Sequence, residues 1–169
     1  RDRANDINRL ITALENDRLW SAQIDWSKIA LIGHSLGGYT ALGLAGAWPG
    51  WRQPRIRAVI AMSPYVAPFV RNHTLGGLGI PVMYQGGTID SWLTTPWVRR
   101  PGGAYDQTPP PAYYVEFKRA GHFAWTHLTA AHHQEIRYYC LCFLSKYLIN
   151  QQSSCIDRRF PDVSDVRSK

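Results

Sequence analysis

Three residues of this sequence carry the side chains needed for nucleophilic catalysis at a carbonyl group: Ser35, Asp90 and His122. A serine hydroxyl at its ordinary pKa is a poor nucleophile, so it needs an imidazole to take its proton and a carboxylate to orient that imidazole. Each of the three residues follows a short apolar run. If these runs are parallel strands, their ends bring the three side chains to one edge of a sheet. We therefore expect Ser35 to be the nucleophile, His122 the base and Asp90 the orienting acid.

The segment around Ser35 reads Gly-His-Ser-Leu-Gly, a G-x-S-x-G motif between an apolar run and a helical pattern. A sharp strand-to-helix turn strains the central serine and exposes its side chain, and we expect Gly33, Gly37 and Gly38 to supply the room. The backbone N–H of Leu36 opens the helix and is expected to face the oxyanion. A serine that caps a helix after a glycine turn gives the same local pattern, so the motif alone leaves both interpretations open.

Other carboxylates and imidazoles fit the remaining two roles less well. The second apolar run ends at Ser63 with no carboxylate, and Asp106 lies deep in a long loop with no strand to fix it. Within the motif, His34 is expected to pack or to hydrogen-bond locally. Asp90 as a turn cap and His122 as a loop histidine bonded to the backbone remain the structural alternatives. The other histidines lie in a loop or near the last helix: His73, His127, His132 and His133.

Four apolar runs and three amphipathic segments define the expected elements. The runs predict buried strands at residues 28–33, 57–63, 80–85 and 112–117. The amphipathic segments predict helices at residues 6–16, 36–48 and 134–149. Buried strands that alternate with helices are typical of an α/β domain, so we expect a mainly parallel sheet of about four strands flanked by helices. The long connection at residues 86–111, rich in Pro and Gly, is expected to be functional or mobile.

The chain of 169 residues has an ordinary globular composition, with 18% charged and 45% hydrophobic residues. We expect one domain at residues 1–150, followed by a loose polar tail at residues 151–169. The net charge of +7 comes from separated basic pairs rather than from a run, which argues against a nucleic-acid partner. No apolar run reaches the ~18 residues that a membrane span needs.

The three cysteines are an odd number and do not form a disulfide framework. Cys140 and Cys142 lie two residues apart in the expected last helix, where they point to different sides and are not expected to pair. Either one reaches Cys155 only if the tail folds back, so the pairing and the cellular compartment stay open. The spacing of cysteines and histidines matches no zinc pattern, and neither a metal nor a cofactor is expected.

Three tryptophans near the expected site are candidates for lining a substrate pocket: Trp92, Trp97 and Trp125. Ordinary packing is the structural alternative for each ring, because large aromatic side chains more often serve that purpose.

Residues 33–41, 61–65, 85–90 and 121–125 together resemble the C-terminal part of α/β-hydrolases. Over residues 5–149, the chain is similar to bacterial dienelactone-hydrolase-like and platelet-activating-factor-acetylhydrolase-like enzymes. Dienelactone hydrolases proper use a cysteine nucleophile, and Ser35 in its place favours a serine carboxylester hydrolase. The resemblance implies an acyl-enzyme mechanism on a small-molecule or lipid-like ester, without a cofactor.

The resemblance also implies about four further N-terminal strands that have no counterpart in these residues, and hence a partial α/β-hydrolase fold. A second oxyanion donor belongs to that region, so Leu36 is expected to act alone, at a cost on the order of 10²–10³-fold in turnover. The strand at residues 28–33 is expected to have an open outer edge through which the chain self-associates. The alternative to an esterase is a catalytically impaired fragment or a non-catalytic interaction module of the same fold.

Overall fold

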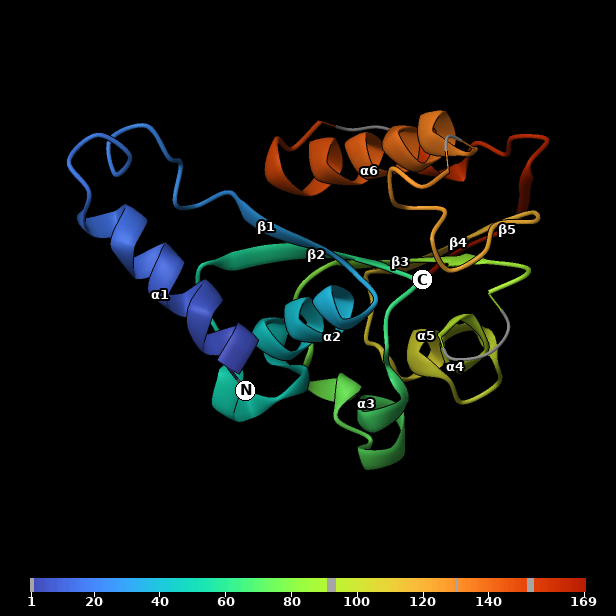
Figure 1. Ribbon diagram of the computed structural model, residues 1–169, viewed down its shortest axis with the longest axis horizontal. Coiled ribbons are helices and arrows are strands. Elements are labelled where there is room, and N and C mark those ends of the chain that lie inside the picture. The colour runs from blue at the N-terminus through green and yellow to red at the C-terminus, as the bar shows by residue number, and fades with distance from the viewer. Residues whose placement is uncertain (1, 91–93, 130, 152–153) are drawn as a thin grey trace.

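The computed structural model describes residues 2–90, 94–129, 131–151 and 154–169. Within these residues, five strands form one sheet in the order of the sequence; the first four are parallel and the last is antiparallel to its neighbour (Figure 1). The strands are β1 (Ile29–His34), β2 (Ile56–Met62), β3 (Val82–Gly87), β4 (Ala112–Phe117) and β5 (Val163–Ser168). The helices are α1 (Asp2–Asn16), α2 (Leu36–Leu42), α3 (Ala67–Asn72), α4 (Thr95–Arg99), α5 (Ala104–Gln107) and α6 (His133–Leu148). No helix in these ranges is long and apolar enough to cross a membrane.

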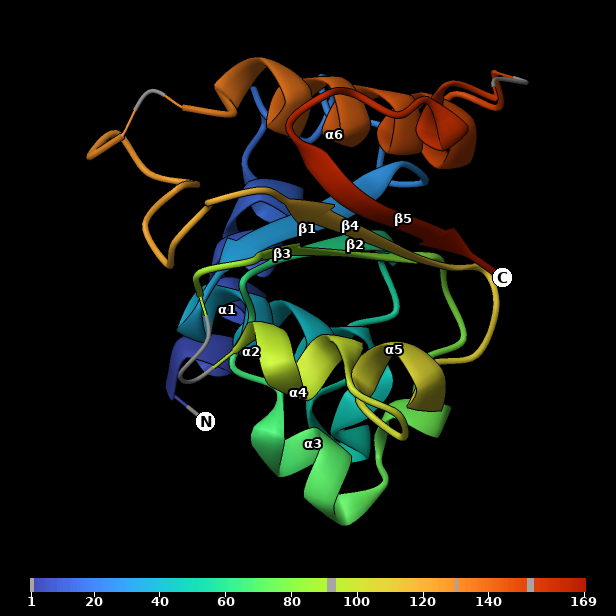
Figure 2. The same cartoon turned by 90° about the vertical axis from the view of Figure 1, so that its right-hand side faces the viewer.

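Helices cover both faces of the sheet. The long helix α6 lies over one face, and α2 to α5 lie under the other, with α1 beside α2 (Figures 1 and 2). Along β2, Val59 and Ala61 belong to the core under the sheet, whereas Ala58 and Ile60 belong to the core below α6. All four side chains are fully buried, which explains why this strand reads as a continuous apolar run. The predicted α/β fold with a mostly parallel sheet is confirmed, as are its four parallel strands.

The structure differs from the expected loose tail at residues 151–169. In that segment, β5 pairs with β4 and adds a fifth strand to the sheet, with Val163 opposite Phe117 and Val166 opposite Val115. A short helical turn at Cys155–Asp157 comes before β5 and joins the core below α6. A few apolar side chains spaced through a polar segment are therefore enough to attach it, since the sheet supplies the backbone partners.

A disulfide joins Cys142 of α6 to Cys155, with 5.8 Å between their Cα atoms, and so settles the pairing that the sequence left open. The tail folds back along α6, as this pairing requires. Cys140 is a free, buried thiol, and burial raises its pKa to about 11.

The connection between β3 and β4 contains α4 and α5, which pack under the sheet beside these two strands (Figure 2). Val98 and Ala104 are fully buried there. The hydroxyl residues Thr94 and Thr95 are each only 1% exposed, although they precede or begin a helix. The described part of this connection is therefore packed, and its buried threonines face the site described below.

Strand β1 is the opposite edge of the sheet from β5 and is hydrogen-bonded to β2 alone within the described residues. Ile32 in this strand is 51% exposed. An apolar strand edge that is open to solvent favours pairing with another chain. Self-association through β1 remains a prediction.

Candidate active site

Ser35 lies at the turn from β1 into α2, with a positive φ of 54° and a ψ of −117°. This conformation is strained for a residue with a side chain, and tight packing maintains it. A Cβ atom at Gly33 would lie 2.3 Å from the carbonyl group of Gly37, and one at Gly38 would lie 2.8 Å from Pro64 Cβ. At Gly37 itself, a Cβ would meet nothing within 4 Å. The turn therefore needs the glycines at positions 33 and 38, and the expectation that it also needs Gly37 for room is wrong.

Of the three side chains singled out in the sequence, His122 contacts both of the others. His122 Nε2 is 3.0 Å from Ser35 Oγ, and His122 Nδ1 is 3.3 Å from Asp90 Oδ1. The carboxylate of Asp90 is almost fully buried, with 4% of its side chain exposed, whereas the imidazole of His122 is 28% exposed. The ring thus lies between a half-buried hydroxyl on one side and a buried carboxylate on the other, which is the arrangement that activates a serine.

A fourth side chain, Ser63, takes part in this cluster and was missed as a site residue. It follows β2 with a positive φ of 42° and is fully buried. Its Oγ lies 3.0 Å from His122 Nδ1 and donates a hydrogen bond to Asp90 Oδ2. The Nδ1–H of His122 therefore has two acceptors, Asp90 Oδ1 and Ser63 Oγ. Because Ser63 is buried and lies on the Nδ1 side of the ring, its hydroxyl is badly placed to attack a substrate, unlike that of Ser35.

Two threonines complete the surroundings of the Asp90 carboxylate. Thr94 Oγ1 and Thr95 Oγ1 both donate to Asp90 Oδ2, the latter over 3.1 Å. Thr95 Oγ1 in turn accepts the backbone N–H of Gly87 over 3.1 Å, which fixes the direction of its own hydroxyl. A buried carboxylate without partners is costly, and hydroxyls from two segments satisfy this one.

His34, the residue before Ser35, contacts the loop that carries His122. Its Nε2 lies 2.6 Å from the backbone oxygen of His122, and the two rings are 4.7 Å apart. Burial lowers the pKa of His34, so the ring is neutral near pH 7 and its Nε2 carries the proton that bonds the carbonyl. The hydrogen bond that the sequence suggested is thus made to a residue far along the chain.

Three of the four remaining candidates from the sequence lie in the part of the chain that the structure describes. Leu36 begins α2 directly after Ser35, which places its backbone N–H next to that residue. Trp97 contacts the guanidinium groups of Arg71 and Arg100, which lie 4.9 and 3.6 Å from its ring centre. Trp125 donates from Nε1 to Gln85 over 2.9 Å, and its ring is 6.1 Å from that of His34. Trp92 lies outside the described residues. Ordinary packing accounts for the contacts of Trp97 and Trp125, and a role in substrate binding stays a prediction.

A large, exposed apolar residue is the chain neighbour of each of Ser35, Asp90 and His122. Leu36 follows Ser35, Ile89 precedes Asp90 and Phe123 follows His122, and these three apolar residues are 43%, 63% and 55% exposed. We call them the apolar rim. A Cβ atom at Gly121, the residue before His122, would touch Ile89, and the Phe123 ring is 5.4 Å from the His122 ring. Phe123 is therefore the residue of the apolar rim that contacts the imidazole directly.

Within the described ranges, no group of three His, Cys, Asp or Glu side chains is arranged to hold a metal ion. The chemistry of the cluster is that of a hydroxyl, an imidazole and a carboxylate, none of which needs a metal to act on a carbonyl group.

Comparison with known proteins identifies the fold and the family of the chain. The chain is similar to the esterase domain from a Rhodothermus marinus protein, with 18% sequence identity and a TM-score of 0.52. That alignment covers 70% of this chain and 60% of the other, so this chain spans less than two thirds of that domain's length. At this identity the likeness shows a shared fold. No curated protein matches the sequence significantly. The model of the alpha/beta hydrolase family matches residues 2–150, and the chain belongs to this family.

Proposed function

We propose that this protein is a serine carboxylester hydrolase that works through an acyl-enzyme. The observation that carries the proposal is the position of His122, whose Nε2 is 3.0 Å from Ser35 Oγ while its Nδ1 faces Asp90. The strained turn at Ser35 adds support, because such strain persists where a reactive side chain must be presented. Within the family, the proposal places the chain near the dienelactone-hydrolase-like and platelet-activating-factor-acetylhydrolase-like enzymes.

In the proposed first half-reaction, Ser35 Oγ attacks the carbonyl carbon of the ester while His122 Nε2 takes the hydroxyl proton. The negative charge that develops on the carbonyl oxygen is stabilised by the N–H of Leu36. Asp90 and Ser63 hold the Nδ1–H, which orients the imidazolium. The ester bond then breaks, and the alcohol leaves with the proton from His122 Nε2.

In the second half-reaction, water takes the place of the alcohol. His122 removes a proton from the water, whose oxygen attacks the acyl carbon on Ser35. The serine leaves with that proton, and the carboxylic acid is released. No step requires a cofactor.

The apolar rim supports an ester with an apolar acyl or alcohol part. Apolar area that is removed from water contributes about 25 cal/mol per Å², and three large side chains beside the triad provide such area to a bound substrate. The proposed substrates are therefore small-molecule or lipid-like esters rather than charged ones.

Hydrolysis of p-nitrophenyl esters of increasing acyl length tests both parts of the proposal. We expect hydrolysis that Ser35→Ala abolishes, and a kcat/KM that rises from acetate to butyrate to hexanoate. Equal hydrolysis by the wild-type protein and Ser35→Ala would refute the esterase. Activity that falls with each added methylene would refute the apolar substrate while leaving the esterase intact.

The open edge of β1 favours the second candidate, an impaired or non-catalytic interaction module. That candidate predicts a folded protein with no esterase activity and a specific oligomer on size-exclusion chromatography. A variant with Ile32→Lys, which puts a charge on the edge strand, is then expected to dissociate the oligomer.

A further inference from the structure

Helix α4 connects the triad acid to a second polar cluster. Thr94 and Thr95 stand at the beginning of this helix and donate to Asp90, whereas Arg99 is its last residue. Five helical residues span only about 7.5 Å at ~1.5 Å per residue, so the two ends of α4 are expected to move together. Whatever fixes Arg99 therefore also fixes the hydroxyls that hold Asp90.

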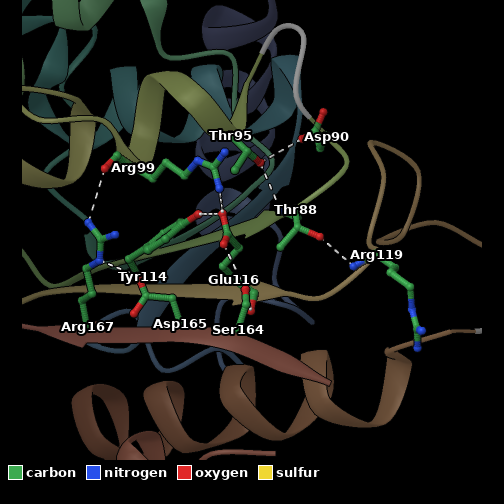
Figure 3. A network of polar contacts seen from close by, with 11 residues as sticks. Thr88, Asp90, Thr95, Arg99, Tyr114, Glu116, Arg119, Ser164, Asp165 and Arg167 are labelled. Atoms are coloured by element: carbon green, nitrogen blue, oxygen red, sulfur yellow. Dashed lines mark hydrogen bonds and ion pairs between the residues drawn. The ribbon is translucent and has the colours of Figure 1, made fainter. Parts of the chain in front are cut away.

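The group that fixes Arg99 is the buried carboxylate of Glu116 on β4. The Glu116 side chain is 8% exposed, and its Oε1 lies 2.9 Å from Arg99 Nη1. The same oxygen accepts the hydroxyl of Tyr114 over 2.8 Å, and burial raises the pKa of that phenol far above its usual range, so it stays a donor. The other carboxylate oxygen accepts Ser164 Oγ over 2.9 Å (Figure 3). Each oxygen of the Glu116 carboxylate therefore has at least one hydrogen-bond donor. We call Glu116 and its partners Arg99, Tyr114 and Ser164 the Glu116 cluster.

Strand β5 contributes to the cluster from beyond residues 2–150, the part that matches the family model. The hydroxyl of Ser164 lies within hydrogen-bond distance of two Glu116 oxygens, 2.9 Å from the carboxylate Oε2 and 3.0 Å from the backbone carbonyl oxygen. Arg167 Nη1 donates to the carbonyl oxygen of Arg99 over 3.3 Å, and Arg167 Nε is 2.6 Å from Asp165 (Figure 3). The C-terminal strand thus contacts both the end of α4 and the carboxylate that pairs with it.

We propose that Arg99 and Glu116, supported by Ser164 from β5, are positioning residues that hold Asp90 against His122 through α4. The inference rests on the proposed role of Asp90 as the triad acid. It gives β5, an edge strand of the sheet, a role in positioning Asp90. A purely structural role for the same contacts predicts lower stability without any change at His122.

The double substitution Arg99→Met with Glu116→Gln tests the proposal without changing the net charge. Removing both charges also avoids an unpaired buried carboxylate, which is the costly outcome of a single substitution. NMR of the isotopically labelled ring records the resonance of the His122 Nδ1–H proton, which reports its hydrogen bond to Asp90. Partial displacement of Asp90 lengthens that hydrogen bond and is expected to move the resonance upfield.

Two further variants separate positioning from stability. Ser164→Ala removes one neutral hydroxyl and is expected to move the resonance of the His122 Nδ1–H proton in the same direction by a smaller amount. The matched control is Arg55→Met with Glu15→Gln, which removes a 2.6 Å ion pair at the end of α1. This control is expected to leave the resonance of the His122 Nδ1–H proton unchanged, whatever it does to the melting temperature.

The outcomes distinguish this inference from the proposed function, because the NMR measurement does not depend on ester hydrolysis. An upfield shift of the His122 Nδ1–H resonance in the double variant and in Ser164→Ala, but not in the control, supports the inference. An unchanged resonance in folded Ser164→Ala and in the folded double variant overturns it, even if Ser35 is catalytically active. If the double variant does not fold, Ser164→Ala alone decides. The ionisable groups that touch His122 in the described residues, Asp90 and His34, are intact in every variant.

Discussion

Replacing Ser63 by alanine removes one hydroxyl from the contact between Asp90 and His122. This hydroxyl donates to a buried carboxylate and accepts from His122 Nδ1. A hydrogen bond to a charged group contributes about 1.5–3 kcal/mol, and this one gains strength when the imidazolium forms. Thr94 and Thr95 still hold the carboxylate in the variant, so we expect a loss within that range and not beyond it.

A loss of about 1.5–3 kcal/mol in transition-state stabilisation corresponds to a decrease of about 10- to 150-fold in kcat. KM is expected to change little, because Ser63 is fully buried and does not face the substrate. Steady-state hydrolysis of p-nitrophenyl acetate measures both constants. The matched control is Ser27→Ala, which removes a serine hydroxyl bonded to the exposed carboxylate of Asp25 and is expected to have no effect on kcat.

Two results would refute this reasoning about Ser63. A loss of 10⁴-fold or more would mean that Ser63 does chemistry itself, as a nucleophile would. A change of less than about twofold would mean that its hydroxyl does not contribute to holding the imidazolium, despite the contacts with Asp90 and His122.

Further expectations concern Asp90, His34 and the cysteines. Asp90→Asn, which favours the wrong tautomer of the His122 imidazole, is expected to lower kcat by about 10⁴-fold in the same assay. Burial holds the pKa of His34 below its ordinary 6.5, so below that pH the unfolded chain binds more protons than the folded chain. The free energy of unfolding is thus expected to fall as the pH drops below about 6.5. Urea unfolding of His34→Gln is expected to give a free energy of unfolding that depends less on pH. Iodoacetamide is expected to modify only Cys140 in the unfolded, unreduced chain. The double variant Cys142→Ser with Cys155→Ser is expected to lose about 3 kcal/mol of unfolding free energy, because the disulfide no longer restricts the unfolded chain.

Much of this fold was predictable because its parallel strands are buried on both faces. Such strands read as continuous apolar runs, and each of the four predicted runs overlaps an observed strand. The order serine, aspartate, histidine then places candidate residues at strand ends without any knowledge of side-chain contacts. Asp90 and His122 were identified in this way, and the structure places the His122 ring between Ser35 and Asp90.

The features that were not predicted depend on contacts between residues far apart in the chain. A serine after β2 has no periodicity that marks it as a partner of Asp90, and only its place at a strand end offered a signal. Strand β5 has just two apolar residues in six, too few to stand out from a polar segment. Arg99 and Glu116 pair across 17 positions from a short helix to a strand, and no local spacing rule links them.

Labelling with a fluorophosphonate, followed by mass spectrometry of the labelled peptide, directly tests whether this cluster activates Ser35. We expect the wild-type chain to carry the label on Ser35, and His122→Ala to react at least about 10³-fold more slowly. Ser63→Ala is expected to be labelled on Ser35 as well, at a reduced rate. A label on Ser63, or no label on the folded wild-type chain under conditions that modify a known serine esterase, would contradict the assignment of Ser35 as the nucleophile.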